Sequence, residues 1–316
     1  MPIIKDNQDI FEKILTCNFN NMIEKSIFPT QLKLAEVKPI FKKGSKLDMT
    51  NYRPVSILPT ISKIYERCMY RQMSSYFEHI LSKYQCGFRK DFSTQHALIA
   101  MIEKWRQSLD EKKVCGALLT DLSKAFDCLP YDLLIAKLLH AYGFDKSSLE
   151  LVHSYLSDRK QRVRIENTFS SWFEISHGVP QGSILGPLLF NIYIYICDIF
   201  MFIGNIDMMS YADDNTPFLV GRESEIVISE LSTITKTIFN WFENNGMKAN
   251  PDKCHLIVTE NGNFQIEHDN FLIENSVCEK ILGVKVDNKL TFKNHVETLC
   301  KKASQKLALF QEYHPI

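Results

Sequence analysis

Three aspartates stand out because their setting suits metal-dependent chemistry. Asp121 ends the short apolar run VCGALLTD, and Asp213 and Asp214 are neighbours within Tyr-Ala-Asp-Asp. Consecutive residues of a regular strand point to opposite faces, so two adjacent acids can serve one site only where the chain turns. If that turn lies beside the end of the apolar run, three carboxylates gather at one edge of a sheet. Such a cluster needs cations to neutralise it, and hard oxygen ligands favour Mg²⁺.

Two Mg²⁺ ions about 4 Å apart would activate a 3′-hydroxyl and stabilise a leaving pyrophosphate. A lone Asp-Asp pair is more often an ordinary exposed turn, so the surrounding sequence has to decide between the two interpretations.

A sheet is needed to position these side chains. The middle of the chain predicts strands over about residues 114–121, 207–220 (strand, turn, strand) and 254–259, with helices over about 131–141, 147–156 and 223–245 between them. This order predicts an α+β fold with a split βαβ core, in which helices cover one face of an antiparallel sheet. Further predictions are a hairpin with a cationic loop over about 33–53, helices over 62–79 and 93–110, a basic strand pair over 159–175, hairpins over 264–290 and a basic helix over 294–310.

Seven ordered blocks of the sequence resemble the reverse transcriptase family. Three are similar to its motifs A, B and C: DLSKAFD from Asp121, GVPQGSILGPLLFNI from Gly178 and YADD from Tyr211. Four more resemble the non-LTR (LINE-type, jockey-like) retrotransposon lineage in the same order: NYRPVSILPTISKIYER from Asn51, QCGFRKDFST from Gln85, NPDKCH from Asn250 and ILGVKVD from Ile281. The resemblance implies a right-hand polymerase, an RNA-directed DNA polymerase that adds dNTPs to a DNA primer 3′ end on an RNA template, with a DNA template as the alternative.

The resemblance also implies the metal ligands. Asp121 and Asp213 would be the main ligands of two Mg²⁺ ions, with Mn²⁺ as an alternative ion. Asp214 would lie beside them, and the carbonyl of Leu122 would be a further ligand. Lys253 matches the lysine that the family offers as a general acid to pyrophosphate. A plain surface lysine is an equally good interpretation of that position.

Five residues would bind the incoming nucleotide if the resemblance holds. Phe126 matches the aromatic residue under the sugar, where a 2′-hydroxyl would collide with the ring. The alternative is an ordinary core phenylalanine. Gln181 matches an amide that contacts the nucleotide, and Gly182 would let the backbone approach the new base pair. Lys42 and Arg53 match cations that hold the triphosphate, although Lys42 also suits a solvated basic loop.

Primer and template contacts are implied in two places. Leu282 and Gly283 lie in the block that resembles the primer grip, where Gly283 suits a close approach of the backbone. Arg159 and Arg162 belong to a basic strand that would follow template or primer phosphates. The alternative is a solvated strand face.

Composition excludes several other classes of protein. The 37 Lys and Arg balance 37 Asp and Glu, so any nucleic-acid binding must rest on local patches. The nine cysteines form no C-x-x-C pair, and the first residues carry acids where a signal peptide needs apolar ones. We therefore expect an intracellular protein, cytoplasmic or nuclear. The apolar stretch 184–203 contains Pro187, Asn191 and Asp198, which disfavours a membrane span.

The expected organisation follows the resemblance: a lead-in over 1–32, fingers over 33–112 with part of 159–180, a palm over 113–260, primer-grip hairpins over 261–292 and the start of a truncated thumb over 293–316. Against a complete element of this lineage, the chain would begin just ahead of the fingers and end inside the first thumb helix. The rival hypothesis is a catalytically impaired, nucleic-acid-binding remnant of a decayed retrotransposon copy.

Overall fold

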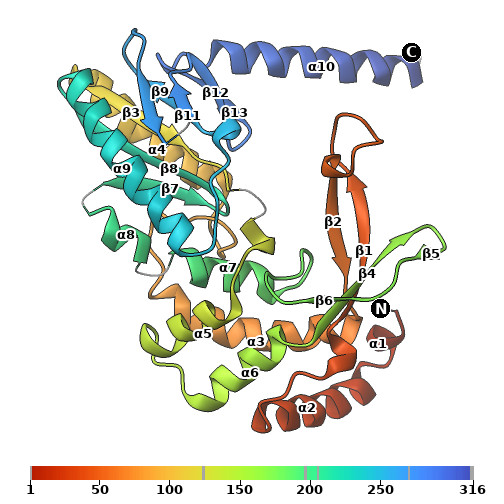
Figure 1. The fold of residues 1–316 in the computed structure, drawn as a ribbon. Coiled ribbons are helices and arrows are strands. Elements are labelled where there is room, and N and C mark those ends of the chain that lie inside the picture. The colour runs from red at the N-terminus through yellow and green to blue at the C-terminus, as the bar shows by residue number, and fades with distance from the viewer. Residues whose placement is uncertain (1, 123–124, 196–197, 205, 270, 314–316) are drawn as a thin grey trace. The chain divides into compact units, whose positions relative to one another are not determined.

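The computed structural model describes residues 2–122, 125–195, 198–204, 206–269 and 271–313 (Figure 1). The chain divides into two compact units, each assembled from pieces that lie far apart in the sequence. Unit 1 comprises Met1–Ser82, Lys124–Cys197 and Asn244–Met247, and unit 2 comprises Lys83–Ser123, Asp198–Glu243 and Lys248–Ile316. Both units contain helices and sheets. The predicted α+β fold class is confirmed.

Unit 2 is built on a four-stranded antiparallel sheet with the order β7-β8-β3-β9. Its strands are β3 (Val114–Leu119), β7 (Asp207–Tyr211), β8 (Asp214–Gly221) and β9 (His255–Val258). The central strand β3 is buried on both faces, which explains why its sequence is a continuous apolar run. The predicted strand, turn and strand over 207–220 is the β7–β8 hairpin.

Helices α4 (Thr94–Asp110) and α9 (Ser224–Asn244) cover opposite faces of this sheet (Figure 1). Cys115 and Ala117 of β3 share an apolar cluster with Trp105 of α4. A Cβ atom on Gly116 would instead lie 2.9 Å from Val227 of α9. Because successive strand residues point to opposite faces, the two helices lie on different sides. The predicted split βαβ core did not include the helix over 93–110, so α4 adds a helix on the second face of the sheet. The sequence predicts a helix over 93–110 but not the face on which that helix packs.

Unit 2 continues with two hairpins, as predicted, and a long helix. The first pairs β10 (Gln265–His268) with β11 (Phe271–Glu274), and the second pairs β12 (Cys278–Ile281) with β13 (Val284–Asp287). Asp287 then fixes the loop that leads to α10 (Lys293–Tyr313): its carboxylate accepts hydrogen bonds from the backbone N–H groups of Lys289, Thr291 and Phe292 at 2.7–3.1 Å. A short helix, α8 (Asp198–Phe202), precedes β7.

Unit 1 combines a five-stranded sheet with a group of helices. The sheet has the order β2-β1-β4-β5, with β6 also paired to β4, and β1 and β4 are parallel. The strands are β1 (Leu34–Phe41), β2 (Tyr52–Ile57), β4 (Arg159–Ile165), β5 (Thr168–Phe169) and β6 (Phe173–Ile175). The helices are α1 (Pro2–Asp6), α2 (Gln8–Glu24), α3 (Thr60–Glu78), α5 (Tyr131–His140), α6 (Lys146–Leu156) and α7 (Leu185–Tyr195). The rings of Phe19 of α2 and Tyr65 of α3 are stacked with their centroids 4.9 Å apart, so α2 packs on the core of unit 1.

The buried carboxylate of Glu66 joins three parts of unit 1. Glu66 is fully buried on α3, and it accepts hydrogen bonds from the backbone N–H groups of Ile184 and Leu185 at 2.7 and 3.1 Å. The hydroxyl groups of Ser62 and Tyr155 also donate to it. A carboxylate at the first turn of a helix is stabilised by the unpaired N–H groups there. Glu66 therefore fixes the start of α7 and, with it, the preceding turn that carries Gln181.

The longest apolar stretch of the sequence, 184–203, is divided between α7 and α8. Among the described residues, no helix is both long and apolar enough to cross a membrane.

Candidate active site

The register of β3 against β8 sets Asp121 opposite Asp214. The two strands are antiparallel, and a bridge between Thr120 and Asn215 extends their pairing toward the end of β3. Thr120 and Asn215 exchange both backbone hydrogen bonds, at 2.9 and 3.3 Å. The next pair outward, Asp121 and Asp214, therefore stands at a position without such bonds, where the two side chains come closest and share one face. The strand pairing thus brings these two aspartates together.

Asp213 occupies the turn between β7 and β8. Tyr211 pairs with Asp214 across the hairpin, which leaves a loop of only two residues, Ala212 and Asp213. Ala212 has φ +59°. A positive φ at the first loop residue alone is typical of a type II′ turn, where glycine is the favoured residue. An alanine in this conformation is strained, and the surrounding structure has to hold it in place.

The segment Tyr84–Gly87 supplies that support from the outer edge of the sheet. The N–H group of Cys86 donates to the carbonyl of Ser210 at 2.8 Å, and the N–H group of Ser210 donates to the carbonyl of Tyr84 at 3.0 Å. A Cβ atom on Gly87 would lie 2.2 Å from the backbone nitrogen of Ala212. Only glycine therefore allows this segment to lie so close to the turn that carries Asp213.

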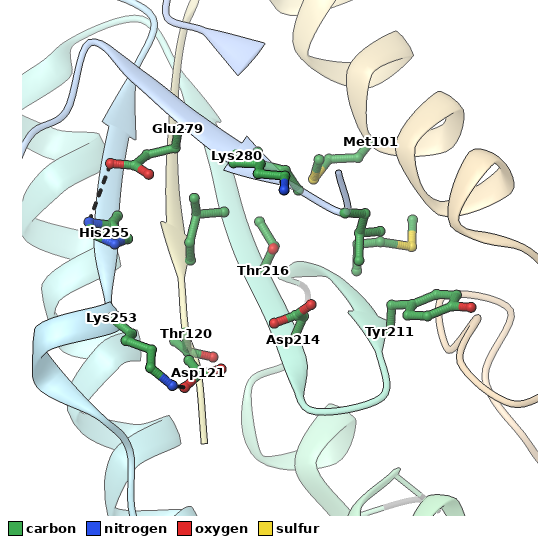
Figure 2. A pocket seen from close by; sticks show the side chains of 14 residues that line it. Met101, Thr120, Asp121, Tyr211, Asp214, Thr216, Lys253, His255, Glu279 and Lys280 are labelled. Atoms are coloured by element: carbon green, nitrogen blue, oxygen red, sulfur yellow. Dashed lines mark hydrogen bonds and ion pairs between the residues drawn. The ribbon is translucent and has the colours of Figure 1, made fainter. Parts of the chain in front are cut away.

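A cavity of about 290 Å³ opens beside the aspartate pair (Figure 2). Its lining includes Asp121 and Asp214 at the edge of the sheet, Lys253 in the short turn before β9, Met101 of α4 and Leu282 of the β12–β13 hairpin. All of these residues belong to unit 2. Both charged and apolar side chains therefore line the cavity, and the charged ones include Glu279 and Lys280 of the same hairpin.

Lys253 neutralises part of this negative charge. Its ammonium nitrogen lies 2.7 Å from Oδ2 of Asp121 (Figure 2). The lysine follows Asn250, whose backbone N–H group donates to the carbonyl of Asp121 at 2.8 Å. Leu122 pairs with Ala249 in an antiparallel bridge and is buried. The segment before β9 is thus fastened along the end of β3, which places the lysine at the first aspartate.

The aspartates interact electrostatically. Loss of hydration, followed by the negative charges of Asp213 and Asp121, raises the pKa of Asp214 to about 6, and the ammonium group of Lys253 opposes this effect. Asp214 as a whole is nevertheless exposed to solvent. The three aspartates carry more negative charge than the ammonium group of Lys253 alone neutralises, so a cation that entered beside them would be attracted.

The carboxylate oxygens of the three aspartates are suitable ligands for a hard divalent ion. Carboxylate oxygens are the ligands that Mg²⁺ prefers. The ammonium group of Lys253, which is paired with Asp121, shows that a cation is stabilised at this position. Within the described part of the chain, no group of three or more His, Cys, Asp or Glu side chains converges closely enough to hold a metal ion. Binding would therefore require Lys253 to leave Asp121 and the aspartates to turn toward one another.

The β12–β13 hairpin borders the same cavity. Leu282 and Gly283 form its two-residue loop and both have positive φ, +46° and +96°. This combination is typical of a type I′ turn. A Cβ atom on Gly283 would meet nothing within 4 Å, so no other part of the protein comes close to this residue. Its positive φ therefore explains the glycine, whereas the expected close approach of a backbone is not seen within the protein. His255 of β9 lies 3.3 Å from Glu279 of β12 and so links the hairpin to the sheet (Figure 2).

The expected nucleotide-binding residues all belong to unit 1. Phe126 is half-buried and stacks on Phe190 of α7, with ring centroids 4.3 Å apart. Its carbonyl accepts a hydrogen bond from the N–H group of Val179 at 2.9 Å. The ring therefore sits on a rigid support and keeps one part exposed.

Gln181 and Gly182 lie against the end of β2. The carbonyl of Gln181 accepts from the N–H group of Ser56 at 2.7 Å, and its amide donates to Asp127 at 3.3 Å. Gly182 has φ +122°, and a Cβ atom there would lie 2.7 Å from the carbonyl oxygen of Ser56. Within the protein, the close approach at Gly182 is to the backbone of β2. Arg53 is exposed on that same strand, and Lys42 is exposed at the far end of the β1–β2 hairpin.

Arg159 contradicts its expected role in binding phosphates. It is fully buried, its guanidinium lies 4.7 Å from the ring of Tyr155, and it donates to the carbonyl of the same residue. No phosphate can reach it in this conformation. Arg162 is partly exposed but forms an ion pair with Glu36 of β1.

Comparison with protein families shows which family the chain belongs to. The model of the reverse transcriptase (RNA-dependent DNA polymerase) family matches residues 40–286. The chain belongs to the reverse transcriptase family. Polymerases of this family depend in general on divalent metal ions, which agrees with the carboxylates around the cavity.

Relatives support the predicted lineage within the reverse transcriptases. The chain is 28% identical over 302 residues to the probable RNA-directed DNA polymerase from transposon BS of Drosophila melanogaster, covering 92% of this chain and 33% of that protein. It is 26% identical over 307 residues to the RNA-directed DNA polymerase from mobile element jockey of the same organism, covering 94% and 33%. The resemblance to jockey-like elements is confirmed. The chain spans about a third of the length of these relatives.

Solved structures support the reverse transcriptase fold. The apo telomerase from Candida tropicalis truncated from its C-terminal domain matches with a TM-score of 0.59 at 15% identity, covering 89% of this chain and 59% of that one. The telomerase from Candida albicans in complex with a fragment of telomeric RNA matches with a TM-score of 0.56 at 14% identity, covering 84% and 48%. At these identities the likeness concerns the fold.

Two features of this reverse transcriptase site were not predicted from the sequence. One is the contact of Gly87 with the Tyr-Ala-Asp-Asp turn. The block QCGFRKDFST carries the glycine, but its spacing alone does not identify the turn as its partner. The other is the His255–Glu279 pair, which joins residues 24 positions apart. No periodic pattern signals either contact.

Proposed function

We propose that this chain is an RNA-directed DNA polymerase, a nucleotidyltransferase that adds dNTPs to the 3′ end of a DNA primer on an RNA template. The observation that carries the proposal is the Asp121–Asp214 pair, with Asp213 in the adjoining turn, in a chain of the reverse transcriptase family. The excess negative charge beside the cavity supports it.

Asp121, Asp213 and Asp214 would hold two Mg²⁺ ions, with the carbonyl of Leu122 as a further ligand and Mn²⁺ as an alternative ion. When bound, the ions would lower the pKa of the primer 3′-hydroxyl and neutralise the triphosphate. The protein's own part is to keep the carboxylates at the end of two rigid strands. Once free of Asp121, Lys253 holds a proton that its ammonium group can donate to the departing pyrophosphate.

The unit 1 residues would bind the nucleotide. Lys42 and Arg53 would contact the triphosphate, and Gln181 and Gly182 would lie along the nucleotide. Phe126 would exclude a ribose 2′-hydroxyl by its volume, and its stack on Phe190 keeps the ring from yielding. Leu282 and Gly283 would hold the primer end.

Four names describe the parts in this proposal: fingers over 33–112 with part of 159–180, a palm over 113–260, a primer grip over 261–292, and a thumb that begins within 293–316. The compact units divide the chain differently, since residues 83–112 group with the catalytic sheet and residues 124–197 with the β1–β2 hairpin. The functional names therefore follow the expected contacts with substrate.

Primer extension on poly(rA)/oligo(dT) with Mg²⁺ tests the proposal. We expect extension by the unchanged chain, and a loss of several orders of magnitude in Asp121→Asn and Asp213→Asn with folding retained. Asp252→Asn is the matched control, because it removes the same charge from an exposed residue next to Lys253. Extension by the two aspartate variants at the unchanged rate would overturn the proposal. RNA binding without any extension by the unchanged chain would favour the impaired remnant.

A further inference from the structure

Glu66 is a buried carboxylate to which the proposed function gives no role. It lies on α3 and is 0% exposed, and α3 packs against α7 (Figure 1). A buried charge is costly unless hydrogen bonds compensate it. Here part of the compensation comes from the backbone at the start of α7, where the N–H groups of Ile184 and Leu185 donate at 2.7 and 3.1 Å. Glu66 is therefore bonded to a helix end that is distant in the sequence.

The start of α7 is linked to the turn that carries Gln181. The hydroxyl group of Ser183 accepts a hydrogen bond from the N–H group of Gly186 at 3.0 Å and donates one to the carbonyl of Pro180 at 2.9 Å. The backbone N–H group of Ser183 donates to the same carbonyl at 3.0 Å. Ser183 thus joins the first turn of α7 to the residue directly before Gln181. A shift of the helix start would therefore displace Gln181.

A second expected nucleotide contact also depends on α7. Phe190 is 0% exposed, lies further along α7, and supports the ring of Phe126 with the ring centroids 4.3 Å apart. A ring excludes a hydroxyl group by its volume only as far as the support behind it resists displacement. The amide of Gln181 and the ring of Phe126 therefore both take their positions from the start of α7. All of these residues belong to unit 1.

We propose that Glu66 is a positioning residue for the incoming nucleotide, which determines both the affinity for the dNTP and the preference for deoxyribose over ribose. Because Glu66 is fully buried, it does not touch the nucleotide. Its carboxylate fixes the start of α7, and α7 in turn fixes Gln181 and Phe126. The inference rests on the proposed polymerase activity and extends it to a residue outside the nucleotide site. A glutamate with a structural role alone would affect stability without affecting the choice of sugar.

Single-nucleotide primer extension by Glu66→Ala tests the proposal. The variant leaves two N–H groups unpaired where water has little access, since Leu185 is 1% exposed, so the helix start should move toward other acceptors. Misplacement by about 1 Å costs about 100-fold, and we expect a smaller shift that raises the KM for dNTP about tenfold. The ratio of dNTP to rNTP incorporation should fall about threefold or more. The kcat should change less than about threefold, because the catalytic aspartates belong to unit 2.

Further variants separate positioning from loss of stability. Phe77→Leu is the control, since Phe77 is also 0% exposed on α3 but packs against the rings of Tyr142 and Phe144. It should lower the melting temperature and leave the KM and the ratio within about twofold. Glu66→Gln keeps an oxygen for the two N–H groups and should restore both quantities to within about threefold of the unchanged chain. Glu66→Asp, whose shorter side chain reaches less far, should change both in the same direction as alanine and gives an answer if the alanine variant does not fold.

Two results would overturn the inference for an active chain: an unchanged KM and ratio in folded Glu66→Ala, and equal changes in Phe77→Leu at equal stability. Hydrogen exchange of the backbone over 178–186 needs no activity. It should be faster in Glu66→Ala and unaltered in Phe77→Leu, and equal exchange in both would exclude the link between Glu66 and the turn. If the unchanged chain extends no primer, the polymerase proposal fails and this inference fails with it. An active chain with unaltered constants in Glu66→Ala refutes the inference alone.

Discussion

Gly87→Ala should disable the catalytic hairpin while leaving the protein folded. The added Cβ atom would stand 2.2 Å from the backbone nitrogen of Ala212 and 3.0 Å from its Cα atom. Ordinary contacts between such atoms begin near 3.5 Å, so one backbone must move by about 1 Å. The atoms met are backbone atoms of a strained turn, which cannot rotate aside as a side chain would.

The size of the effect follows from that displacement. Overpacking of this kind destabilises a protein by about 1–3 kcal/mol. Misplacement of catalytic groups by about 1 Å lowers rates by about 100-fold. We therefore expect Gly87→Ala to lower the melting temperature modestly and primer extension by about 100-fold. Thermal unfolding followed by circular dichroism and single-turnover primer extension measure the two effects separately.

Gly143→Ala provides the matched control. Gly143 has φ +62°, and a Cβ atom there would meet nothing within 4 Å, so alanine adds backbone strain of about 1–2 kcal/mol without a clash. This variant should lose similar stability and retain its extension rate. If Gly87→Ala is as active as Gly143→Ala at equal stability, the reasoning from hairpin displacement is refuted.

Three further predictions concern single side chains. Mg²⁺ should raise the melting temperature of Lys253→Met by more than that of the unchanged chain, because no ammonium group then competes for Asp121. The same variant should extend a primer about 100-fold or more slowly. Lys280→Met is the control, and an equal effect of Mg²⁺ on the melting temperatures of Lys253→Met and the unchanged chain would contradict this prediction. Phe126→Val should lower the ratio of dNTP to rNTP incorporation at least about tenfold, or roughly 1.4 kcal/mol, and an unaltered ratio would leave Phe126 as a core residue. Burial acts to raise the pKa of Asp287, but its hydrogen bonds to the following loop outweigh burial and hold that pKa below its usual range. Its stabilising effect is therefore present above the unfolded-state pKa of about 3.9 and is lost as the pH falls through the lower folded value. Asp287→Asn should lower the free energy of unfolding by about 1–3 kcal/mol at pH 7 and by much less near pH 2, as urea unfolding at both pH values would show; an equal loss at both would exclude the charge as the cause.

The parts of the fold that depend on local pattern were predictable from the sequence. The apolar run before Asp121 became β3, because a central strand is buried on both faces. The two acids of Tyr-Ala-Asp-Asp lie at a hairpin turn, as expected from the rule that neighbouring residues of a regular strand point to opposite faces. In each case the information lies within a few residues of the feature.

Features that depend on distant partners were not predictable in the same way. Arg159 begins a basic strand and was expected to contact phosphates or to face solvent, yet Tyr155 of the preceding helix lies against its guanidinium. The face on which α4 packs and the glycine that admits the catalytic turn both depend on residues far away in the sequence. Periodicity contains no information about such partners. Resemblance to a family indicates which blocks matter, but it does not specify which atoms meet.

The division of unit 1 among three stretches of sequence has a consequence for synthesis on the ribosome. Its last piece, Asn244–Met247, is held there by Asn245, whose Oδ1 atom accepts from the ammonium of Lys137 at 2.8 Å and whose carbonyl accepts from the hydroxyl of Tyr193. Unit 1 therefore cannot complete its contacts until residue 247 has left the exit tunnel. Until then, the segments of unit 1 that are translated first keep apolar surface exposed to solvent, which makes them candidates for chaperone binding. For the same reason, neither unit can be expressed as one uninterrupted fragment of this gene.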